Sequence, residues 1–570
     1  MCYCVLKRYS ISYSMQINHL HVTQPFKGSE PLKGFSLLFF LLLANTAIAQ
    51  YDVILKNGTV YDGHGGAPYK ADVAIRADTI AAIGDLSSAK AKQIIDVTGK
   101  AVSPGFINML SWADGSLLKD GRSMSDIKQG VTLEVFGEGW SPGPRQKKNK
   151  RDTLWTTLGG YFNTLERKGV STNFASFVGA TSVRNLVLGY ENRKPTATEL
   201  IKMKSLVEEA MKQGAMGLGS SLIYAPADYA STHELIELSK VVSKYGGMYI
   251  THIRSESDRI YAALNEVFTI SREAKVPAEI YHLKINNAWN WNKIDTVLFK
   301  IDSAQKAGLK ITADMYTYNA SGTSLTARLP TWVQEGGAVA MRARFKNPVL
   351  RKRLLRELEL GIPSRNSDPK DVMINGFRND SLNKLYQGKR LKEVARLHGK
   401  DANETMLDLI AADKSGVSAI FFLMLEDNVK RMLALPYVSI CSDAGSIPAE
   451  EPFTKDATHP RAYGSFARLL SRYVREEKIM TLQEAVRRMT SLPASNLKIS
   501  NRGSLKVGNY ADVVVFDLAQ VQDRATFEKP HQYAEGINHV FVNGVLVLNN
   551  GAHTGAMPGR CVRGPGWKGR

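Results

Sequence analysis

Residues 248–283 read MYITHIRSESDRIYAALNEVFTISREAKVPAEIYHL and contain two kinds of pattern in alternation. A short apolar run, Met248 to His252, is followed by a segment with helical spacing of apolar residues, Asp258 to Glu273, and then by a second apolar run, Ala278 to Leu283. Apolar runs on either side of an amphipathic helix are typical of buried parallel strands joined by a crossover helix. This stretch therefore predicts a strand–helix–strand unit in which each strand ends near a histidine.

The same alternation continues on both sides of this unit. Further apolar, β-rich runs occupy Val131 to Phe136, Met216 to Ser220, Lys310 to Met315 and Val438 to Asp443. Segments with a helical pattern, such as Thr198 to Lys212, lie between them. Alternation over about 400 residues favours an α/β fold of the (β/α)8 TIM-barrel type. A doubly wound open sheet is less favoured, because no glycine-rich phosphate-binding motif follows a predicted strand.

The two ends of the chain have a different, all-β texture. Val53 to Leu55 and Thr59 to Tyr61 are predicted strands separated by a turn at Asn57-Gly58, and similar runs return at residues 508–517 and 539–544. We therefore expect a small β-sandwich made by residues 50–106 and 501–570 together, with the barrel formed by residues 107–500.

Within the barrel, residues 335–416 interrupt the alternation of strands and helices. This span is rich in Arg and Lys, has a helical pattern and contains three prolines. This span is expected to be an insertion that covers the barrel mouth, where catalytic groups cluster at the carboxyl ends of the strands.

The first 49 residues resemble an export signal. Lys33 precedes an apolar run from Gly34 to Ala44, and Ala47-Ile48-Ala49 offers the small residues of a cleavage site before Gln50. The apolar run is short for a bilayer span. The sequence thus predicts a signal peptide in residues 1–49, a periplasmic or secreted protein, and no stable membrane span after cleavage; a retained anchor is the alternative.

Composition excludes several other classes. The formal net charge is +20, but the basic residues are dispersed and no nucleic-acid-binding motif accompanies them, so no nucleic-acid partner is expected. Only Cys441 and Cys561 follow the signal segment, too few to staple a chain of this size. The basic C-terminal tail is expected to be a solvated end.

Three polar residues lie at the ends of predicted strands: His252, His282 and Asp443. Each alone is more often a core or capping residue. Together they provide what a hydrolytic metal site needs, because imidazoles bind zinc and a nearby carboxylate can take a proton from water.

A series of motifs runs through the chain in a fixed order. These are residues 102–107 (VSPGFI), 217–224 (GLGSSLIY), 251–254 (THIR), 282–284 (HLK), 313–318 (ADMYTY), 442–443 (SD), 459–461 (HPR), 489–491 (MTS) and 511–517 (ADVVVFD). In these motifs the chain resembles the D-aminoacylase (N-acyl-D-amino-acid deacylase) family of the amidohydrolase superfamily, and the likeness extends from Tyr51 nearly to the C-terminus.

The resemblance implies a zinc-binding barrel with a β-sandwich built from both chain ends. It implies that His252 and His282 hold the metal and that Asp443 is the general base. It also implies that the substrate contacts four residues, with Arg461 pairing with its carboxylate: Tyr224, Lys284, Tyr316 and Arg461. A guanidinium fork matches a carboxylate, although a structural ion pair is the alternative for Arg461.

Two departures from the family pattern concern the metal. Where the family places a His-x-His pair, this chain has Leu110 and Trp112, which cannot bind zinc. A second metal site of the usual type is therefore not expected, apolar side chains are expected to fill its space, and about one zinc per chain is predicted.

The other departure is at Gly139, where the family has a metal-binding cysteine. Glu138 is the predicted replacement, because two histidines alone hold zinc poorly and a carboxylate is a competent ligand. The alternatives are that Glu134 points inward instead, or that Lys284, if carbamylated, supplies the third ligand.

The expected activity is hydrolysis of the amide bond of an N-acyl-D-amino acid, a small-molecule substrate. Two alternatives remain open: an amidohydrolase that acts on another amide, such as a dipeptide or a cell-wall fragment, and a barrel that lost catalysis and survives as a binding protein. The sequence does not predict an oligomeric state.

Overall fold

The structure is a computed structural model of the 570-residue chain, and it describes residues 50–147, 154–361, 367–414, 416–455 and 457–569. The predicted signal segment, residues 1–49, lies outside the described residues. Within the described ranges, no helix combines the length and the apolar character needed to cross a bilayer.

Eight parallel strand positions form a closed ring in the described part of the chain. One parallel sheet runs in the order β17-β13-β12-β11-β10-β9, and a second joins β6, β7 and β8. Only Phe177 separates β8 from β9, which links the two sheets on one side. On the other side, the Met109 N–H donates to the Ile440 carbonyl at 3.3 Å and the Asp443 N–H donates to the Leu110 carbonyl at 2.9 Å. The predicted (β/α)8 barrel is thereby confirmed.

The barrel strands are β6 (Phe106–Asn108), β7 (Val131–Phe136), β8 (Asn173–Ser176), β9 (Val178–Gly179), β10 (Gly217–Ser221), β11 (Met248–His252), β12 (Ala278–Ile280), β13 (Ile311–Met315) and β17 (Val438–Ile440). The helices around them are α2 (Met124–Ile127), α3 (Leu158–Lys168), α4 (Ala180–Leu188), α5 (Ala197–Lys212), α6 (Thr232–Lys244), α7 (Ile260–Ala274), α8 (Ile294–Lys306), α14 (Glu426–Leu433), α15 (Arg461–Arg468), α16 (Leu482–Met489) and α17 (Ser491–Asn496).

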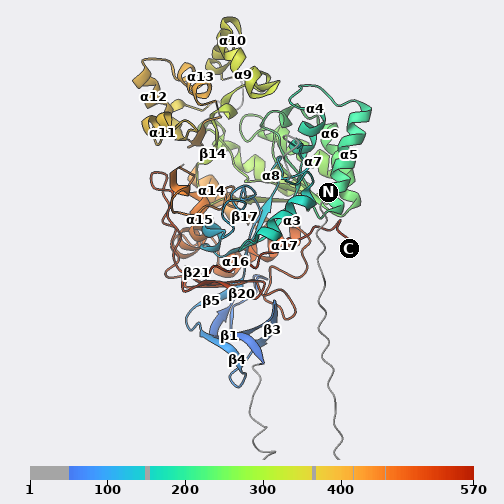
Figure 1. The fold of residues 1–570 in the computed structure, drawn as a ribbon, viewed down its shortest axis with the longest axis vertical. Coiled ribbons are helices and arrows are strands. Elements are labelled where there is room, and N and C mark those ends of the chain that lie inside the picture. The colour runs from blue at the N-terminus through green and yellow to red at the C-terminus, as the bar shows by residue number, and fades with distance from the viewer. Residues whose placement is uncertain (1–49, 148–153, 362–366, 415, 456, 570) are drawn as a thin grey trace, which may run out of the picture. The chain divides into compact units, whose positions relative to one another are not determined.

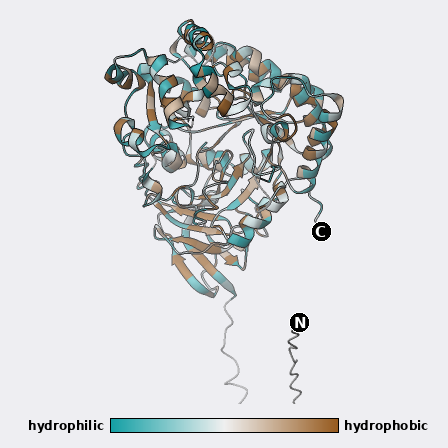
Figure 2. Ribbon diagram, turned by 45° about the horizontal axis from the view of Figure 1, so that its top comes forward, coloured by the Kyte–Doolittle hydropathy of each residue, from teal (hydrophilic) through white to brown (hydrophobic). Residues whose placement is uncertain are grey.

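Local sequence explains where these helices begin. At the start of α5, the Thr196 side chain accepts from the Glu199 N–H while the Glu199 side chain accepts from the Thr196 N–H, a capping box that satisfies two otherwise orphaned donors. In Figure 2 the helices carry both hydrophilic and hydrophobic stretches, as amphipathic crossover helices should.

Strands from both chain ends form one sheet, with the order β21-β20-β19-β18-β5-β1-β2-β3 and with β4 paired to β1. In β18, alternate residues belong to different cores, because side chains of a strand alternate between the faces of its sheet. Val513 and Val515 pack among the N-terminal strands, whereas Val514 and Phe516 belong to the core of the barrel. Figure 1 shows the blue N-terminal strands beside β20.

The strands of this sheet are β1 (Tyr51–Val60), β2 (Tyr69–Arg76), β3 (Thr79–Gly84), β4 (Ala91–Asp96), β5 (Ala101–Pro104), β18 (Val513–Phe516), β19 (Ile537–Val542), β20 (Val545–Asn549) and β21 (Ala552–His553). The predicted turn at Asn57-Gly58 is wrong. It is a bulge inside the continuous strand β1, where the register with β2 shifts and Asn57 adopts a φ of 65°. Asparagine tolerates this left-handed conformation, so its turn-like signature fits a bulge equally well.

The insertion forms its own small unit. β14 (Ser321–Ser324), β15 (Val372–Gly376) and β16 (Ser418–Phe421) make an antiparallel sheet, and Leu329, Leu391 and Leu407 belong to a hydrophobic core separate from that of the barrel. The unit begins at β14 and ends at β16, so it reaches beyond the predicted span of 335–416 on both sides. Its helices gather at one end of the ribbon in Figure 1. They are α9 (Gly337–Lys346), α10 (Pro348–Glu359), α11 (Asp380–Tyr386), α12 (Leu391–His398) and α13 (Ala402–Asp413).

The C-terminal tail is not the solvated end that its charge predicted. The Gly559 N–H donates to the Val170 carbonyl and the Val562 N–H donates to the Phe174 carbonyl, both at 2.8 Å. Arg560 pairs with Asp78 at 2.7 Å. The tail therefore lies against the edge of β8, and its charges are partly used in holding it there.

Candidate active site

One cavity of about 680 Å³ lies between the carboxyl ends of the barrel strands and the insertion. The insertion contributes Thr323 and Met341 to its wall, and the barrel contributes most of the residues singled out from the sequence. Seven of the eight predicted site residues line the cavity: Glu138, Tyr224, His252, His282, Lys284, Asp443 and Arg461. The eighth, Tyr316, is buried behind the wall.

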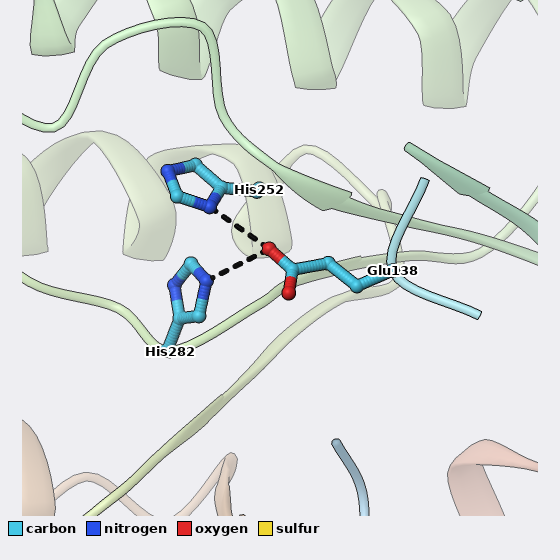
Figure 3. Close-up of side chains that lie close together, drawn as sticks. All are labelled: Glu138, His252 and His282. Atoms are coloured by element: carbon cyan, nitrogen blue, oxygen red, sulfur yellow. Dashed lines mark hydrogen bonds and ion pairs between the residues drawn. The ribbon is translucent and has the colours of Figure 1, made fainter. Parts of the chain in front are cut away.

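Glu138, His252 and His282 converge on a single point (Figure 3). Glu138 Oε1 lies 2.9 Å from Nδ1 of His252 and 3.1 Å from Nε2 of His282. One potential ligand atom from each residue lies within 4.8 Å of the others, and all three side chains are buried. Among the described residues, these three form the one group of three or more His, Cys, Asp or Glu side chains that could hold a metal ion.

Backbone geometry aims the two histidines into the cavity. His252 is the last residue of β11, so its side chain lies at the strand end. His282 follows β12 by two residues with a φ of 36°, a conformation that non-glycine residues seldom adopt, and its N–H donates to Asp314 Oδ1 at 2.8 Å. Such strained positions cluster at functional sites.

Two glycines with positive φ values flank Glu138: Gly137 at 108° and Gly139 at 69°. A Cβ atom on residue 139 would lie 2.0 Å from Ser221 Oγ, so a side chain does not fit there as the backbone stands. Glu138 instead places its carboxylate in the lining of the cavity. The alternative, Glu134, accepts hydrogen bonds from Ser111 at 2.7 Å and Thr172 at 2.8 Å, and its carboxylate is used away from the histidines.

Sequence reasoning missed a second carboxylate in this site. Glu256 Oε1 accepts a hydrogen bond from Lys284 Nζ at 2.6 Å and lies 3.2 Å from His282 Nδ1 and 3.4 Å from His252 Nε2. Lys284, predicted to bind substrate, is thus anchored to Glu256. The only sequence clue was that Glu256 lies four residues after His252. Glu256 lies in a loop, and spacing in a loop does not indicate which side chains lie close together.

The carboxylates are held in their ionised form. Burial raises the pKa of both Glu138 and Glu256. At Glu138 the two histidines outweigh burial, and at Glu256 the histidines and Lys284 do so, so each pKa lies below its usual value. Burial and Lys284 lower the pKa of His282, but Glu138 and Glu256 outweigh both and raise it to about 10. The two ionised carboxylates are therefore matched within the cluster by the His282 imidazole and the Lys284 ammonium.

Asp443 lies across the cavity in a φ of 48° and has both carboxylate oxygens engaged. Oδ1 accepts a hydrogen bond from the indole N–H of Trp112 at 3.1 Å, and Oδ2 pairs with Arg461 Nη1 at 2.8 Å. Leu110 is fully buried, as expected of an apolar side chain that fills the space of a second metal site. Trp112 is instead 37% exposed, lines the cavity and uses its indole N–H in the hydrogen bond to Asp443. The ion pair is the alternative that the sequence left open for Arg461.

The two tyrosines have different places. The Tyr224 hydroxyl lies 2.9 Å from Thr323 Oγ1 and so connects the barrel to the insertion. The Tyr316 ring instead stacks beneath the Arg461 guanidinium, 4.6 Å from its centroid. Tyr316 therefore supports a cation by cation–π attraction and does not face the cavity.

The donor set fits a zinc ion. Catalytic zinc sites commonly use two histidines and one glutamate with a position left for water or substrate, and the three side chains here meet at the edge of a cavity. Lys284, the other candidate for the third ligand, donates a hydrogen bond to Glu256.

Comparisons with known proteins agree with this geometry. A model of the amidohydrolase family matches residues 93–548. The chain is 34% identical to a D-aminoacylase of Alcaligenes xylosoxydans xylosoxydans, with 90% of this chain and 97% of the relative covered. It is 33% identical to an N-acyl-D-glutamate deacylase of the same organism, covering 90% and 96%.

Solved structures give the same answer. A crystal structure of D-aminoacylase is similar with a TM-score of 0.75 and 33% identity, over 90% of this chain and all of that one. The N-acyl-D-glutamate deacylase of Bordetella bronchiseptica, solved with zinc and a phosphonate mimic of the tetrahedral intermediate, has a TM-score of 0.76 and 30% identity, over 90% and 99%. Sequence, fold and site together lead to one conclusion: the chain belongs to the amidohydrolase family.

Proposed function

We propose that the protein is a zinc-dependent hydrolase that cleaves the amide bond of N-acyl-D-amino acids. The observation that carries the proposal is the convergence of Glu138, His252 and His282 beside Asp443 in one cavity. The relatives named D-aminoacylase and N-acyl-D-glutamate deacylase, similar over nine-tenths of the chain, supply the substrate class.

Glu138, His252 and His282 would hold the metal. Zinc at this place supplies Lewis acidity toward the scissile carbonyl and the attacking water. We propose about one tightly held zinc per chain, because Leu110 and Trp112 offer no imidazole where the family pattern has its His-x-His pair.

Asp443 is the proposed general base. Its carboxylate takes a proton from the water that attacks the amide carbon, and it returns a proton to the amine nitrogen as the C–N bond breaks. Trp112 and Arg461 hold its two oxygens, so the base has a fixed direction before the substrate arrives.

Arg461 is the proposed partner of the substrate carboxylate. Its side chain is buried, and its Nε atom has no hydrogen-bond partner among the described residues. A buried donor without a partner is costly, and a carboxylate that enters the cavity can satisfy it.

The direct test is an assay with paired enantiomers. We expect the zinc-loaded protein to release free amine from N-acetyl-D-amino acids and much more slowly from the L-enantiomers, measured with an amine-reactive dye. Hydrolysis of dipeptides in place of both would favour the alternative amide substrate. Absence of turnover on all of them, with zinc bound, would favour the binding-protein alternative.

Glu138→Gln should weaken metal retention, because a neutral amide replaces an ionised oxygen ligand. After dialysis against a mild chelator, elemental analysis should find about one zinc per wild-type chain and much less in the variant, with activity partly recovered by added zinc. The matched control is Glu134→Gln, in β7, which ends two residues before Glu138; its carboxylate is bonded to Ser111 and Thr172. Loss of zinc from the control alone would transfer the ligand role to Glu134.

Asp443→Asn should keep the zinc but lower kcat by roughly 10²–10⁴-fold, the usual contribution of a positioned base. The control is Asp258→Asn, since Asp258 also accepts an indole N–H, from Trp289 at 2.8 Å, but at the protein surface. Steady-state kinetics and metal analysis of both variants give the answer. A wild-type kcat in Asp443→Asn would remove this residue from the mechanism.

We also infer that the protein is exported and acts in the periplasm or outside the cell. The support is the sequence of residues 33–49, in which a lysine, an apolar run and Ala47-Ile48-Ala49 follow the order of a signal peptide. N-terminal sequencing of the protein recovered from the periplasmic fraction should begin at Gln50. An uncleaved chain in the cytoplasm would contradict export.

A further inference from the structure

We propose that Glu256 is a positioning residue for the metal site: its carboxylate holds His252 in the orientation and tautomer that turn Nδ1 of that ring toward Glu138. The inference rests on the metal site of the proposed function, and it assigns a role to a carboxylate that the mechanism above does not use.

The two imidazoles lie between two carboxylates. Glu138 Oε1 contacts Nδ1 of His252 and Nε2 of His282, at 2.9 and 3.1 Å. Glu256 Oε1 faces the opposite nitrogens, His252 Nε2 at 3.4 Å and His282 Nδ1 at 3.2 Å. Lys284 Nζ lies nearer to the same His282 nitrogen, at 2.6 Å, so Glu256 shares that ring with Lys284 and faces His252 Nε2 without such a competitor. Each ring therefore has one nitrogen on the Glu138 side and the other on the Glu256 side.

Charge decides which side takes the metal. The Lys284 ammonium lies 2.6 Å from Glu256 Oε1, so a divalent ion on that side would meet a positive charge in a buried site, where repulsion is weakly screened. Among the described residues, Glu138 has only the two histidines as cationic partners. The geometry thus makes Glu138 the ligand and leaves Glu256 to bind the far nitrogen of His252.

The chemistry of this role is general. A histidine that binds a metal through one nitrogen usually donates its other ring N–H to a carboxylate, which fixes the tautomer and raises the basicity of the ligand. His252 Nε2 has no hydrogen-bond partner among the described residues, and Glu256 is within a small ring movement of it. Glu256 can then orient His252 directly.

Glu256 is itself held firmly enough to orient other groups. Its side chain is 7% exposed, Lys284 donates to Oε1, and Asn286 donates to Oε2 at 3.1 Å. The Asn286 N–H also donates to the Glu256 carbonyl at 2.8 Å. Backbone and side chain are therefore fixed together, which is the condition for a precise site.

The experiment measures zinc affinity without substrate, by competition with a chromophoric chelator. Glu256→Gln should weaken zinc binding by roughly 10–100-fold, the usual effect of losing such a partner, and Glu256→Asp, which keeps the charge, should recover part of it. The matched control is Glu266→Gln: Glu266 is a largely buried carboxylate paired with Arg254 at 2.9 Å, and it does not line the cavity. It should keep the wild-type affinity.

A second readout separates positioning from ligation. At saturating Co²⁺, Glu256→Gln should keep the visible absorption spectrum of the wild type, because the ligands are unchanged, whereas Glu138→Gln should alter it. Unchanged zinc affinity in Glu256→Gln, or an altered cobalt spectrum, would overturn the assignment. Wild-type protein that binds zinc but has no deacylase activity would contradict the proposed substrate and not the role of Glu256. Wild-type protein that binds no zinc would contradict both the proposed function and the role of Glu256.

Discussion

The site depends on one buried oxygen atom, Oε1 of Glu138, that contacts both imidazoles. Placing an ionised carboxylate in a protein interior is expensive unless its charge is matched and its hydrogen bonds are satisfied. His252 and His282 provide that match, and each comes from the end of a neighbouring barrel strand. The parallel register of β11 and β12 therefore does more than build a core. It brings two rings to a centroid separation of 4.4 Å with nearly perpendicular planes, so that both can address one point.

The barrel could be predicted from sequence where its strands are long enough to give a clear run. β7, β10, β11 and β13, each of five or six residues, fall within a residue or so of the runs identified from the pattern. β6, β8 and β9 escaped, since each is four residues or fewer, and β6 and β8 also contain the polar residues Asn108 and Asn173. The bulge at Asn57 shows the same limit, because local turn chemistry does not tell a loop from a bulge.

The site was foreseeable to the extent that its residues end predicted strands. Glu138, His252, His282 and Asp443 all do so, and the barrel fold brings strand ends together. Glu256 and Trp112 act from loops, and their partners are set by three-dimensional neighbours that no spacing encodes. Tyr316 is a different case. It lies within a motif and follows β13, and its ring lies under the Arg461 guanidinium, outside the lining of the cavity. Membership of a motif identifies a neighbourhood, and only the backbone decides which way a side chain points.

The close approach of residue 139 to Ser221 also bears on how such a site can change over time. A cysteine placed at Gly139 would bring its Cβ to 2.0 Å from Ser221 Oγ and 2.9 Å from the Ser221 backbone nitrogen. Truncating Ser221 would relieve only the first of these, and the loop would still have to move. Exchange of one ligand type for the other thus requires at least two coordinated changes, and each taken alone crosses a state with a weakened metal site or a strained strand end. The glutamate in this chain is therefore separated from the cysteine form by epistasis, a barrier that a single substitution does not cross.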